Sequence, residues 1–310
     1  MTNSGVWDSQ TGFGPLPFLY AGDRHKPSCN RGRILGMRLG VSTGFAHENP
    51  ADWAGKQLEI GAEAVVFPVN SHAEPELIEA YRREAETAGL LIAEVGVWNN
   101  LLSKNPEERA ANEAYAIRQL RLADQIGARC CVNIAGTFGG PKWDGGYKEN
   151  FSEEAFRETV ASVQRILDAA QPQNTDYTLE PMPWMLPTGP EDYLRLLEAV
   201  NREHFAVHLD LVNMINTPER FFFQEEFMEE VFTKLHGRIR SCHLKDIRLD
   251  DRFTFRLEEK KCGEGSLNLE YYAELASRED PEMPMLLEHI DSDAEYRESF
   301  LYVKNRLRGR

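Results

Sequence analysis

Residues 177–210 of this 310-residue chain read YTLEPMPWMLPTGPEDYLRLLEAVNREHFAVHLD. Two short apolar runs, YTLE at 177–180 and FAVHLD at 205–210, enclose the amphipathic segment PEDYLRLLEAV at 190–200. Apolar runs of this length are typical of strands that are covered on both faces, and the amphipathic segment is typical of a helix that packs on one side. The stretch therefore predicts a strand, a crossover helix and a second, parallel strand.

The same alternation extends over most of the chain. We expect six further strands at 37–43, 64–67, 90–95, 130–135, 239–244 and 285–290. We expect seven further helices at 50–61, 75–89, 106–127, 152–170, 224–237, 269–276 and 294–307. Because eight strand–helix repeats occur and no glycine-rich phosphate loop follows the first strand, we expect an α/β fold of the (β/α)8 TIM barrel type rather than an open doubly wound sheet.

Residues 1–36 lack this pattern and are rich in glycine, proline and aromatic residues. They carry apolar side chains that a solvated tail usually lacks, namely Trp7, Phe13, Phe18, Leu19 and Tyr20. We therefore expect an N-terminal arm that packs on the barrel or on a partner subunit, followed by a metal-dependent catalytic barrel over residues 37–310. A disordered tail is the alternative for residues 1–36.

Composition narrows the classes of function. The formal net charge of −15 and the pI of about 5.1 oppose contact with phosphate backbones, so we expect no nucleic-acid partner. The chain has no run of about 18 apolar residues and no secretory signal at its N-terminus, so we expect no membrane association. The five cysteines are odd in number and form no CxxC pair, which favours a reducing cytoplasm over a disulfide framework.

Acidic and imidazole side chains stand at the ends of four consecutive predicted strands: Glu180, Asp210, His243 and Glu288. In a (β/α)8 barrel the carboxyl ends of the strands form one mouth, and neighbouring strands lie about 4.8 Å apart, so these side chains can converge. Three carboxylates at a dry mouth would repel one another, and a divalent cation removes that difficulty. Three oxygen ligands and one nitrogen favour Mn²⁺, with Mg²⁺ or Co²⁺ as alternatives, over a structural zinc. Taken singly, each residue could instead be an ion-pair partner or a core residue.

Other polar and aromatic residues are predicted to lie near the same mouth. His47 follows the first strand and is a candidate catalytic acid, while Glu94 ends the third strand beside the pocket. Lys245 and Asp246 directly follow His243 and are candidates for binding substrate or for orienting a metal ligand. Three tryptophans in loops after strands could hold a sugar or a flat aglycone, or simply pack: Trp98, Trp143 and Trp184.

Two further histidines are expected to lie outside the site. His208 shares the inward face of Asp210 but lies one layer deeper, so we expect a structural role. His289, next to Glu288 in the chain, is expected to face the helices.

Several motifs resemble the xylose isomerase-like TIM barrels, a superfamily of sugar isomerases, sugar epimerases, inosose dehydratases and endonuclease-IV-type nucleases. They are LEP around Glu180, HLKD from His243, GEGSLN at 263–268, LEH around Glu288, and the tract LDLVNMINTPERFF at 209–222, which is similar to sugar phosphate isomerase/epimerase-like proteins. The resemblance covers residues 37–307. It implies that the four strand-end residues bind the metal and that Glu180 and Glu288 act as general bases on opposite faces of the substrate.

The chemistry that this resemblance implies is removal of a proton next to a sugar carbonyl that the metal polarises. Return of the proton gives an epimerised or isomerised sugar, whereas a leaving group next to the carbanion would be eliminated. The nuclease branch of the superfamily needs more histidine ligands than these strand ends supply. We therefore expect a sugar isomerase or epimerase.

Two positions depart from the ketose 3-epimerases of this superfamily. Asn213, a candidate substrate-binding residue, stands where they carry a histidine, and Leu186 stands where they carry a glutamate. A lyase is therefore the alternative function, because the similar C-glycoside deglycosidase α subunits eliminate the aglycone of 3-oxo-glycosides and work with a small β subunit. A homo-oligomer is the other expected assembly, and a non-catalytic sugar-binding barrel is a remote alternative.

Overall fold

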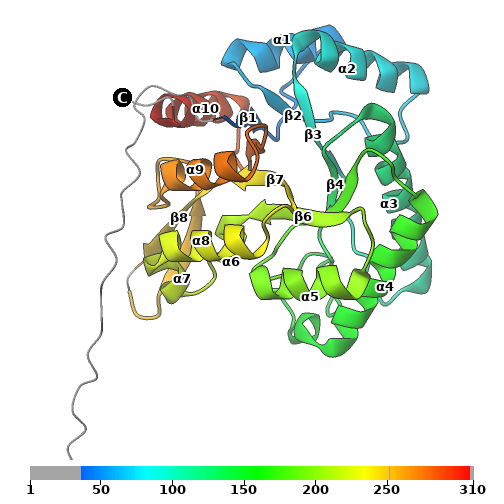
Figure 1. The fold of residues 1–310 in the computed structure, drawn as a ribbon, viewed down its shortest axis with the longest axis vertical. Coiled ribbons are helices and arrows are strands. Elements are labelled where there is room, and N and C mark those ends of the chain that lie inside the picture. The colour runs from blue at the N-terminus through cyan, green and yellow to red at the C-terminus, as the bar shows by residue number, and fades with distance from the viewer. Residues whose placement is uncertain (1–35, 251, 308–310) are drawn as a thin grey trace, which may run out of the picture. The chain divides into compact units, whose positions relative to one another are not determined.

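Eight strands close into a parallel barrel in the computed structural model, which describes residues 36–250 and 252–307 (Figure 1). Their order around the barrel is β1-β10-β7-β6-β5-β4-β3-β2. The strands are β1 (Arg38–Val41), β2 (Ala64–Val66), β3 (Leu91–Gly96), β4 (Cys130–Asn133), β5 (Asp176–Leu179), β6 (Phe205–Asp210), β7 (Ile239–Leu244) and β10 (Pro284–Leu287). Each begins within one residue of a predicted strand, and β10 ends three residues before its predicted end, so the predicted (β/α)8 TIM barrel is confirmed.

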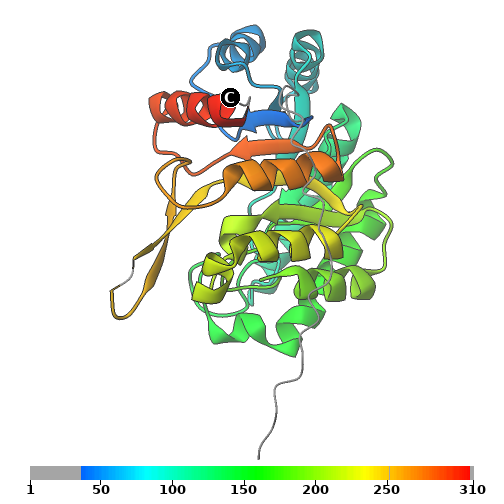
Figure 2. The same ribbon diagram turned by 60° about the vertical axis from the view of Figure 1, so that its left-hand side comes forward.

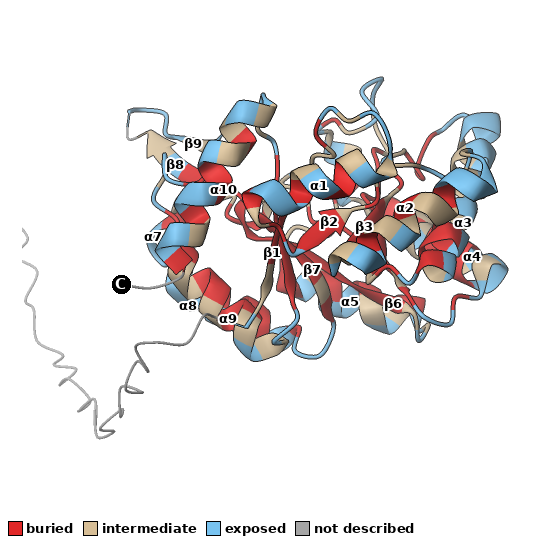
Figure 3. Cartoon of the chain, turned by 90° about the horizontal axis from the view of Figure 1, so that it is seen from above, coloured by how far each residue is buried: buried red, intermediate tan, exposed pale blue. Residues whose placement is uncertain are grey.

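Helices cover the outside of the barrel, and Figure 3 shows buried residues on the strands and a mixture of buried and exposed residues on the helices. The long helices are α1 (Pro50–Ile60), α2 (Pro75–Ala88), α3 (Pro106–Ile126), α4 (Glu153–Ala170), α5 (Pro190–Val200), α8 (Gln224–Lys234), α9 (Leu269–Glu279) and α10 (Asp293–Leu307). All of the predicted helices are present. Short helical segments lie in two of the loops that follow strands: η1 (Lys148–Phe151), α6 (Leu211–Met214) and α7 (Pro218–Phe222).

Local sequence explains where the helices begin and end. The side chain of Asn105 caps α3 by accepting hydrogen bonds from the backbone N–H groups of Glu107 and Glu108. Pro106 occupies the first turn, where its missing N–H group costs no hydrogen bond. The helix ends at Gly127, whose left-handed φ of 71° is a conformation that glycine adopts without strain.

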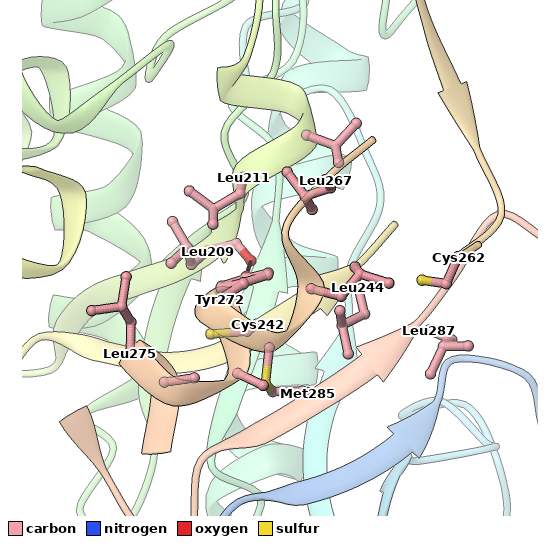
Figure 4. Packing of buried hydrophobic residues seen from close by; sticks show 14 of the residues in the cluster. Leu209, Leu211, Cys242, Leu244, Cys262, Leu267, Tyr272, Leu275, Met285 and Leu287 are labelled. Carbon is pink, nitrogen blue, oxygen red and sulfur yellow. Dashed lines mark hydrogen bonds between the residues drawn. The ribbon is translucent and has the colours of Figure 1, made fainter. Parts of the chain in front are cut away.

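Apolar side chains fill the space between the barrel and its helices. In Figure 4, Tyr272 of α9 lies among Leu209 of β6, Cys242 of β7 and Met285 of β10. All four are fully buried, so this contact removes a large apolar area from water and stabilises the barrel wall. Four cysteines of the described residues are free and buried: Cys130, Cys131, Cys242 and Cys262.

An antiparallel hairpin that the sequence pattern did not predict lies between β7 and α9. It consists of β8 (Asp246–Asp250) and β9 (Arg256–Lys260), and Figure 2 shows it projecting from the barrel. Its strands carry many charged residues, such as Arg248, which pairs with Glu258 across the hairpin at 2.8 Å. The apolar run that marks the barrel strands is therefore absent here.

The N-terminal arm expected over residues 1–36 lies outside the described residues except for Gly36. The domain boundary after residue 36 stays a prediction. Among the helices of residues 36–307 that the structure describes, none combines the length and the apolar character needed to cross a membrane.

Candidate metal centre

Four acidic and imidazole side chains meet at the carboxyl end of the barrel. Glu180 directly follows β5, Asp210 ends β6, His243 lies one residue before the end of β7, and Glu288 directly follows β10. One possible ligand atom from each lies within 4.8 Å of the others, and all four residues are buried. From Nδ1 of His243, the distances are 3.5 Å to Oε1 of Glu180 and 4.0 Å to Oδ2 of Asp210, while a carboxylate oxygen of Glu288 is in direct contact. The fold thus brings together the four residues that stand at the predicted strand ends.

Two buried tyrosines attach the ends of these strands to the surrounding helices. The hydroxyl oxygen of Tyr193, on α5, lies 2.5 Å from the carbonyl oxygen of Leu179 and 2.6 Å from that of His208. The hydroxyl group of Tyr272, on α9, donates to the carbonyl oxygen of His243 at 3.2 Å. These bonds fix the backbone beside three of the four candidate ligands.

The cluster carries an excess of negative charge. The ammonium group of Lys245 contacts two of its carboxylates, Oδ2 of Asp210 at 2.5 Å and Oε1 of Glu288 at 3.1 Å. Burial and the neighbouring Glu288 carboxylate nevertheless raise the pKa of Glu180. Burial opposes protonation of His243, but the carboxylates around it, Glu288 above all, raise its pKa well above the ordinary value. The cluster therefore attracts positive charge strongly.

The donor set fits a divalent cation. Within the described residues, the buried atoms Nδ1 of His243 and Oδ2 of Asp210 have no hydrogen bond, although each has a close ion-pair contact, with Glu288 and Lys245 respectively. Buried polar atoms in proteins are rarely left in this condition. Three carboxylate ligands and one imidazole ligand suit Mn²⁺ or Mg²⁺ better than a structural zinc ion.

Two residues at the mouth were not predicted to lie in the site: Glu259, from β9 of the hairpin, and His289. Oε2 of Glu259 lies 3.4 Å from Nζ of Lys245, and its Oε1 lies 2.9 Å from Nδ1 of His289. Nε2 of His289 lies 2.9 Å from Oε1 of Glu288. The expectation that His289 faces the helices is wrong, because β10 has already ended and the backbone of His289 is left-handed, with φ of 54°.

Lys245 and Asn213, both candidates for substrate binding, contact the carboxylates of the cluster. Lys245 is buried, and its ammonium group meets Asp210 and Glu288 as described. The side-chain amide of Asn213 donates to Oε1 of Glu180 at 3.1 Å, and its backbone N–H group donates to Oδ1 of Asp210 at 3.0 Å. Both residues thus orient candidate ligands, and a direct contact with substrate stays a prediction.

Asp246 holds a loop. Its buried carboxylate accepts hydrogen bonds from the backbone N–H groups of Gly263 at 2.9 Å, Gly265 at 3.0 Å and Leu267 at 2.8 Å. These three residues belong to the GEGSLN motif, so Asp246 joins the start of the hairpin to the loop that follows its end. The structure thus gives Asp246 a structural role, and a contact with substrate stays a prediction.

Glu94 lies beneath the cluster instead of beside the pocket. Its carboxylate, 1% exposed, accepts hydrogen bonds from the hydroxyl group of Ser241 and from Nε2 of His208 at 2.9 Å. Its other oxygen lies 3.3 Å from Nε2 of His243. Glu94 therefore contacts the candidate ligand His243, and the expected contact with substrate stays a prediction. His208 is fully buried one layer below Asp210, which confirms its inward, deeper position.

His47 makes no contact with the four candidate ligands in the described part of the chain. Its Nδ1 lies 2.8 Å from the carbonyl oxygen of Phe45, and its Nε2 lies 2.8 Å from the hydroxyl group of Tyr81 on α2. Both ring nitrogens thus hold the loop after β1 against α2. A role of His47 as a catalytic acid stays a prediction.

The three tryptophans occupy consecutive loops at the mouth, after β3, β4 and β5, and are partly exposed: Trp98 (43%), Trp143 (40%) and Trp184 (39%). The indole N–H group of Trp184 donates to the backbone oxygen of Asp144 at 2.8 Å, which joins the second and third of these loops. Trp98 has a left-handed φ of 51°, a conformation that costs a bulky residue about 1 kcal/mol or more. Such strain commonly marks functional loops.

Comparisons relate this barrel to known proteins. A family model described as xylose isomerase-like TIM barrel matches residues 56–306. No curated protein sequence matches the chain significantly.

Solved structures share the fold. The apo form of 3-keto-D-glucoside 4-epimerase YcjR from E. coli has 14% identity and a TM-score of 0.64, with 87% of this chain and 99% of that chain covered. D-psicose 3-epimerase with D-tagatose from Clostridium cellulolyticum H10 has 12% identity and a TM-score of 0.65, with 88% and 98% covered. A xylose isomerase-like TIM barrel protein from Mycobacterium smegmatis in complex with magnesium has 18% identity and a TM-score of 0.60, with 84% and 91% covered. At these identities the likeness establishes the fold alone.

Proposed function

Because the chain belongs to the xylose isomerase-like TIM barrel family, we propose that it is a divalent-metal-dependent enzyme that removes a proton next to the carbonyl group of a sugar-like substrate. The observation that carries this proposal is the meeting of Glu180, Asp210, His243 and Glu288, with ligand atoms within 4.8 Å of one another. An epimerase of 3-keto-D-glucosides and a D-psicose epimerase share the fold, which supports a carbohydrate as the substrate. Mn²⁺ is the proposed cation, with Mg²⁺ or Co²⁺ as alternatives.

The four residues would hold the cation, and the cation would supply Lewis-acid polarisation of the substrate carbonyl. Glu180 and Glu288 come from β5 and β10, which β6 and β7 separate in the barrel, so their carboxylates approach the centre from different sides. Each can take a proton from carbon and return it as a general base and acid. Asn213 restrains Oε1 of Glu180 at 3.1 Å, and His289 restrains Oε1 of Glu288 at 2.9 Å. These contacts leave Oε2 of Glu180 for a ligand or a proton, whereas Oε2 of Glu288 contacts Nδ1 of His243.

Lys245 completes the charge arrangement of the proposed site. Its ammonium group is buried and lies beside Asp210 and Glu288. A substrate oxygen that gains negative charge as the proton leaves carbon would find a fixed positive charge nearby. Removal and return of the proton gives epimerisation, or isomerisation when the proton returns to the neighbouring carbon.

A lyase is the second candidate function, and the partly exposed tryptophans at 98, 143 and 184 favour it because free ketoses are too small to cover three indole rings. In a 3-oxo-glycoside, a carboxylate would take the proton from C2. The C1–aglycone bond then breaks, its electron pair leaves with the aglycone, which takes up a proton, and a C1=C2 double bond remains. A small β subunit, a homo-oligomer and a cytoplasmic location stay predictions.

Incubation with Mn²⁺ in D₂O, followed by NMR, tests the proposal on ketoses, inososes and 3-oxo-glycosides. Deuterium next to the carbonyl with a changed stereocentre or a moved carbonyl would support an epimerase or isomerase, and release of aglycone would support a lyase. Glu180→Gln and Glu288→Gln should each slow the reaction by about 100-fold or more. Absence of exchange with all three classes, together with unchanged metal binding in His243→Ala, would overturn the proposal.

A further inference from the structure

A buried polar group lies directly beneath the proposed metal centre and belongs to three different strands: Glu94 of β3, His208 of β6 and Ser241 of β7. We propose that Glu94 is a positioning residue that selects the ring tautomer of His243 able to bind the metal. This inference rests on the proposed metal centre. It adds the residue that sets the tautomer of His243, the single nitrogen ligand of that centre.

Glu94 reaches His243 across the whole barrel. In the ring of eight strands, β3 and β7 are four places apart, so they lie opposite each other. Oε2 of Glu94 lies 3.3 Å from Nε2 of His243, while Nδ1 of the same ring faces Glu180, Asp210 and Glu288. Nε2 of His243 therefore faces the Glu94 carboxylate below, and Nδ1 faces the proposed cation above.

Because the two ring nitrogens of His243 have different partners, the position of the ring proton in the metal-binding form is fixed. A neutral imidazole carries one N–H group, and a carboxylate can only accept a hydrogen bond. Donation from Nε2 of His243 to Glu94 therefore leaves a lone pair on Nδ1, which is the form that a metal requires. Nδ1 has no hydrogen bond within the described residues, as expected for an atom kept for a ligand.

Glu94 is itself held so that one oxygen is left for His243. Its Oε1 accepts from Nε2 of His208 at 2.9 Å and from the hydroxyl group of Ser241. The ring of His208 also packs edge-on against the ring of His243, with centroids 4.1 Å apart and planes at 75°, which hinders rotation of the His243 ring. Glu94 and His208 thus control both the tautomer and the orientation of the His243 ring.

A second cation bound by Glu94, His208 and His243 is the competing explanation, because their donor atoms also lie within 4.8 Å of one another. The hydrogen bonds favour the positioning role. Oε1 of Glu94 already receives two donors, and each of its contacts pairs a donor with an acceptor. A count of bound cations decides between the two explanations.

Glu94→Gln tests the proposal with little change in shape. The amide oxygen should stay with the two donors of His208 and Ser241, which turns the NH₂ group towards Nε2 of His243. That nitrogen must then accept, so the proton moves to Nδ1 and blocks the metal. In the full chain we expect Mn²⁺ affinity, measured by electron paramagnetic resonance titration, to fall by about 10- to 100-fold. Proton–nitrogen NMR of ¹⁵N-histidine-labelled protein without metal, recorded at a pH high enough to leave the His243 ring neutral, should show its proton on Nδ1 instead of Nε2.

Thr178→Val is the matched control, because Thr178 is equally buried, points to the barrel interior two residues before Glu180, and donates to the carbonyl oxygen of Cys131. It should keep wild-type affinity and tautomer. Glu94→Asp, which keeps a carboxylate, should keep the proton on Nε2 and supplies the test if Glu94→Gln does not fold. Wild-type Mn²⁺ affinity or an unchanged tautomer in Glu94→Gln would overturn this inference while leaving the metal centre intact. Binding of two Mn²⁺ ions per wild-type chain would also overturn this inference. If the wild-type chain binds no Mn²⁺, the proposed function is refuted instead.

Discussion

The side-chain amide of Asn213 donates a hydrogen bond to Oε1 of Glu180 at 3.1 Å, while the backbone N–H group of Asn213 donates to Oδ1 of Asp210 at 3.0 Å. One residue of the short helix α6 therefore touches two candidate ligands from adjacent strands. The backbone bond exists for any residue at this position except proline, but the side-chain bond depends on asparagine. Substitution of Asn213 thus changes the restraint on Glu180 alone.

Asn213→Ala should slow proton exchange at the substrate carbon more than it weakens metal binding. Glu180 would lose the donor that fixes one of its oxygens, and loss of such an orienting partner commonly costs about 10- to 100-fold in activity. The measurement is the rate of deuterium incorporation at saturating Mn²⁺, beside the Mn²⁺ affinity. Equal losses in both quantities would show that Asn213 acts on the metal and not on the base.

Bound metal should stabilise the fold through the four candidate ligands. A cation present at 100 times its dissociation constant raises the free energy of unfolding by about 2.7 kcal/mol. Thermal unfolding with Mn²⁺ and with a chelator should therefore differ by several degrees in the wild type. Asp210→Asn should remove most of this difference. Asp168→Asn, which removes an exposed carboxylate paired with Arg202 on the helical surface, should leave it unchanged, and a loss there would point to a non-specific effect of charge.

The order of elements along the chain was enough to predict the barrel and to select the four candidate ligands. Carboxyl ends of successive parallel strands meet at one mouth, so Glu180, Asp210, His243 and Glu288 could be brought together without any knowledge of side-chain contacts. This reasoning depends only on the position of each residue within its own strand. It works because the register of a closed barrel leaves little freedom at the strand ends.

Contacts between distant parts of the chain could not be obtained in this way. Glu259 reaches the mouth from a charged hairpin that has no apolar run to reveal it, and Glu94 reaches His243 from the opposite side of the barrel. The alternation of side chains between the two faces of a strand also stops where the strand ends. The left-handed backbone of His289 therefore turns its side chain towards the mouth and not towards the helices. The contact of His47 with Tyr81 could not be predicted for a related reason, since the loop after β1 turns the ring towards α2.

Tyr193→Phe should destabilise the protein by about 1–2 kcal/mol. The lost hydroxyl group is hydrogen-bonded to the carbonyl oxygens of Leu179 and His208. Because both residues are fully buried, water cannot replace the missing hydrogen bond. Urea unfolding of the metal-free protein provides the measurement. Tyr302→Phe on the outer surface of α10 is the control and should change stability by less than about 0.5 kcal/mol. A similar loss in both variants would contradict a special role of the Tyr193 hydroxyl.

Trp98→Ala and Trp184→Ala should separate the two candidate functions. If the exposed indole rings stack on an aglycone, each substitution should raise KM for an aromatic 3-oxo-glycoside by about three- to tenfold, in line with about 0.5–1.5 kcal/mol for an aromatic contact. KM for a free ketose should not change. Phe222→Ala, which removes an aromatic ring that is 67% exposed on α7, is the control and should have no effect on either substrate. Unchanged KM for the glycoside in both tryptophan variants would remove the support for an aglycone site.

Lys245→Met should make the fold depend more strongly on metal. The ammonium group of Lys245 lies 2.5 Å from Asp210 and 3.1 Å from Glu288, so its removal leaves buried carboxylates without their closest positive partner. Loss of one member of a buried ion pair costs about 3–5 kcal/mol, and the metal-free variant should be destabilised by this order. Because a divalent cation would then relieve repulsion that the ammonium group no longer relieves, the increase in melting temperature on adding Mn²⁺ should be larger in the variant than in the wild type. Turnover with bound Mn²⁺ should fall, since the fixed charge beside the reacting oxygen is lost. A smaller increase in melting temperature than in the wild type would show that Lys245 supports metal binding instead of competing with it for the carboxylates.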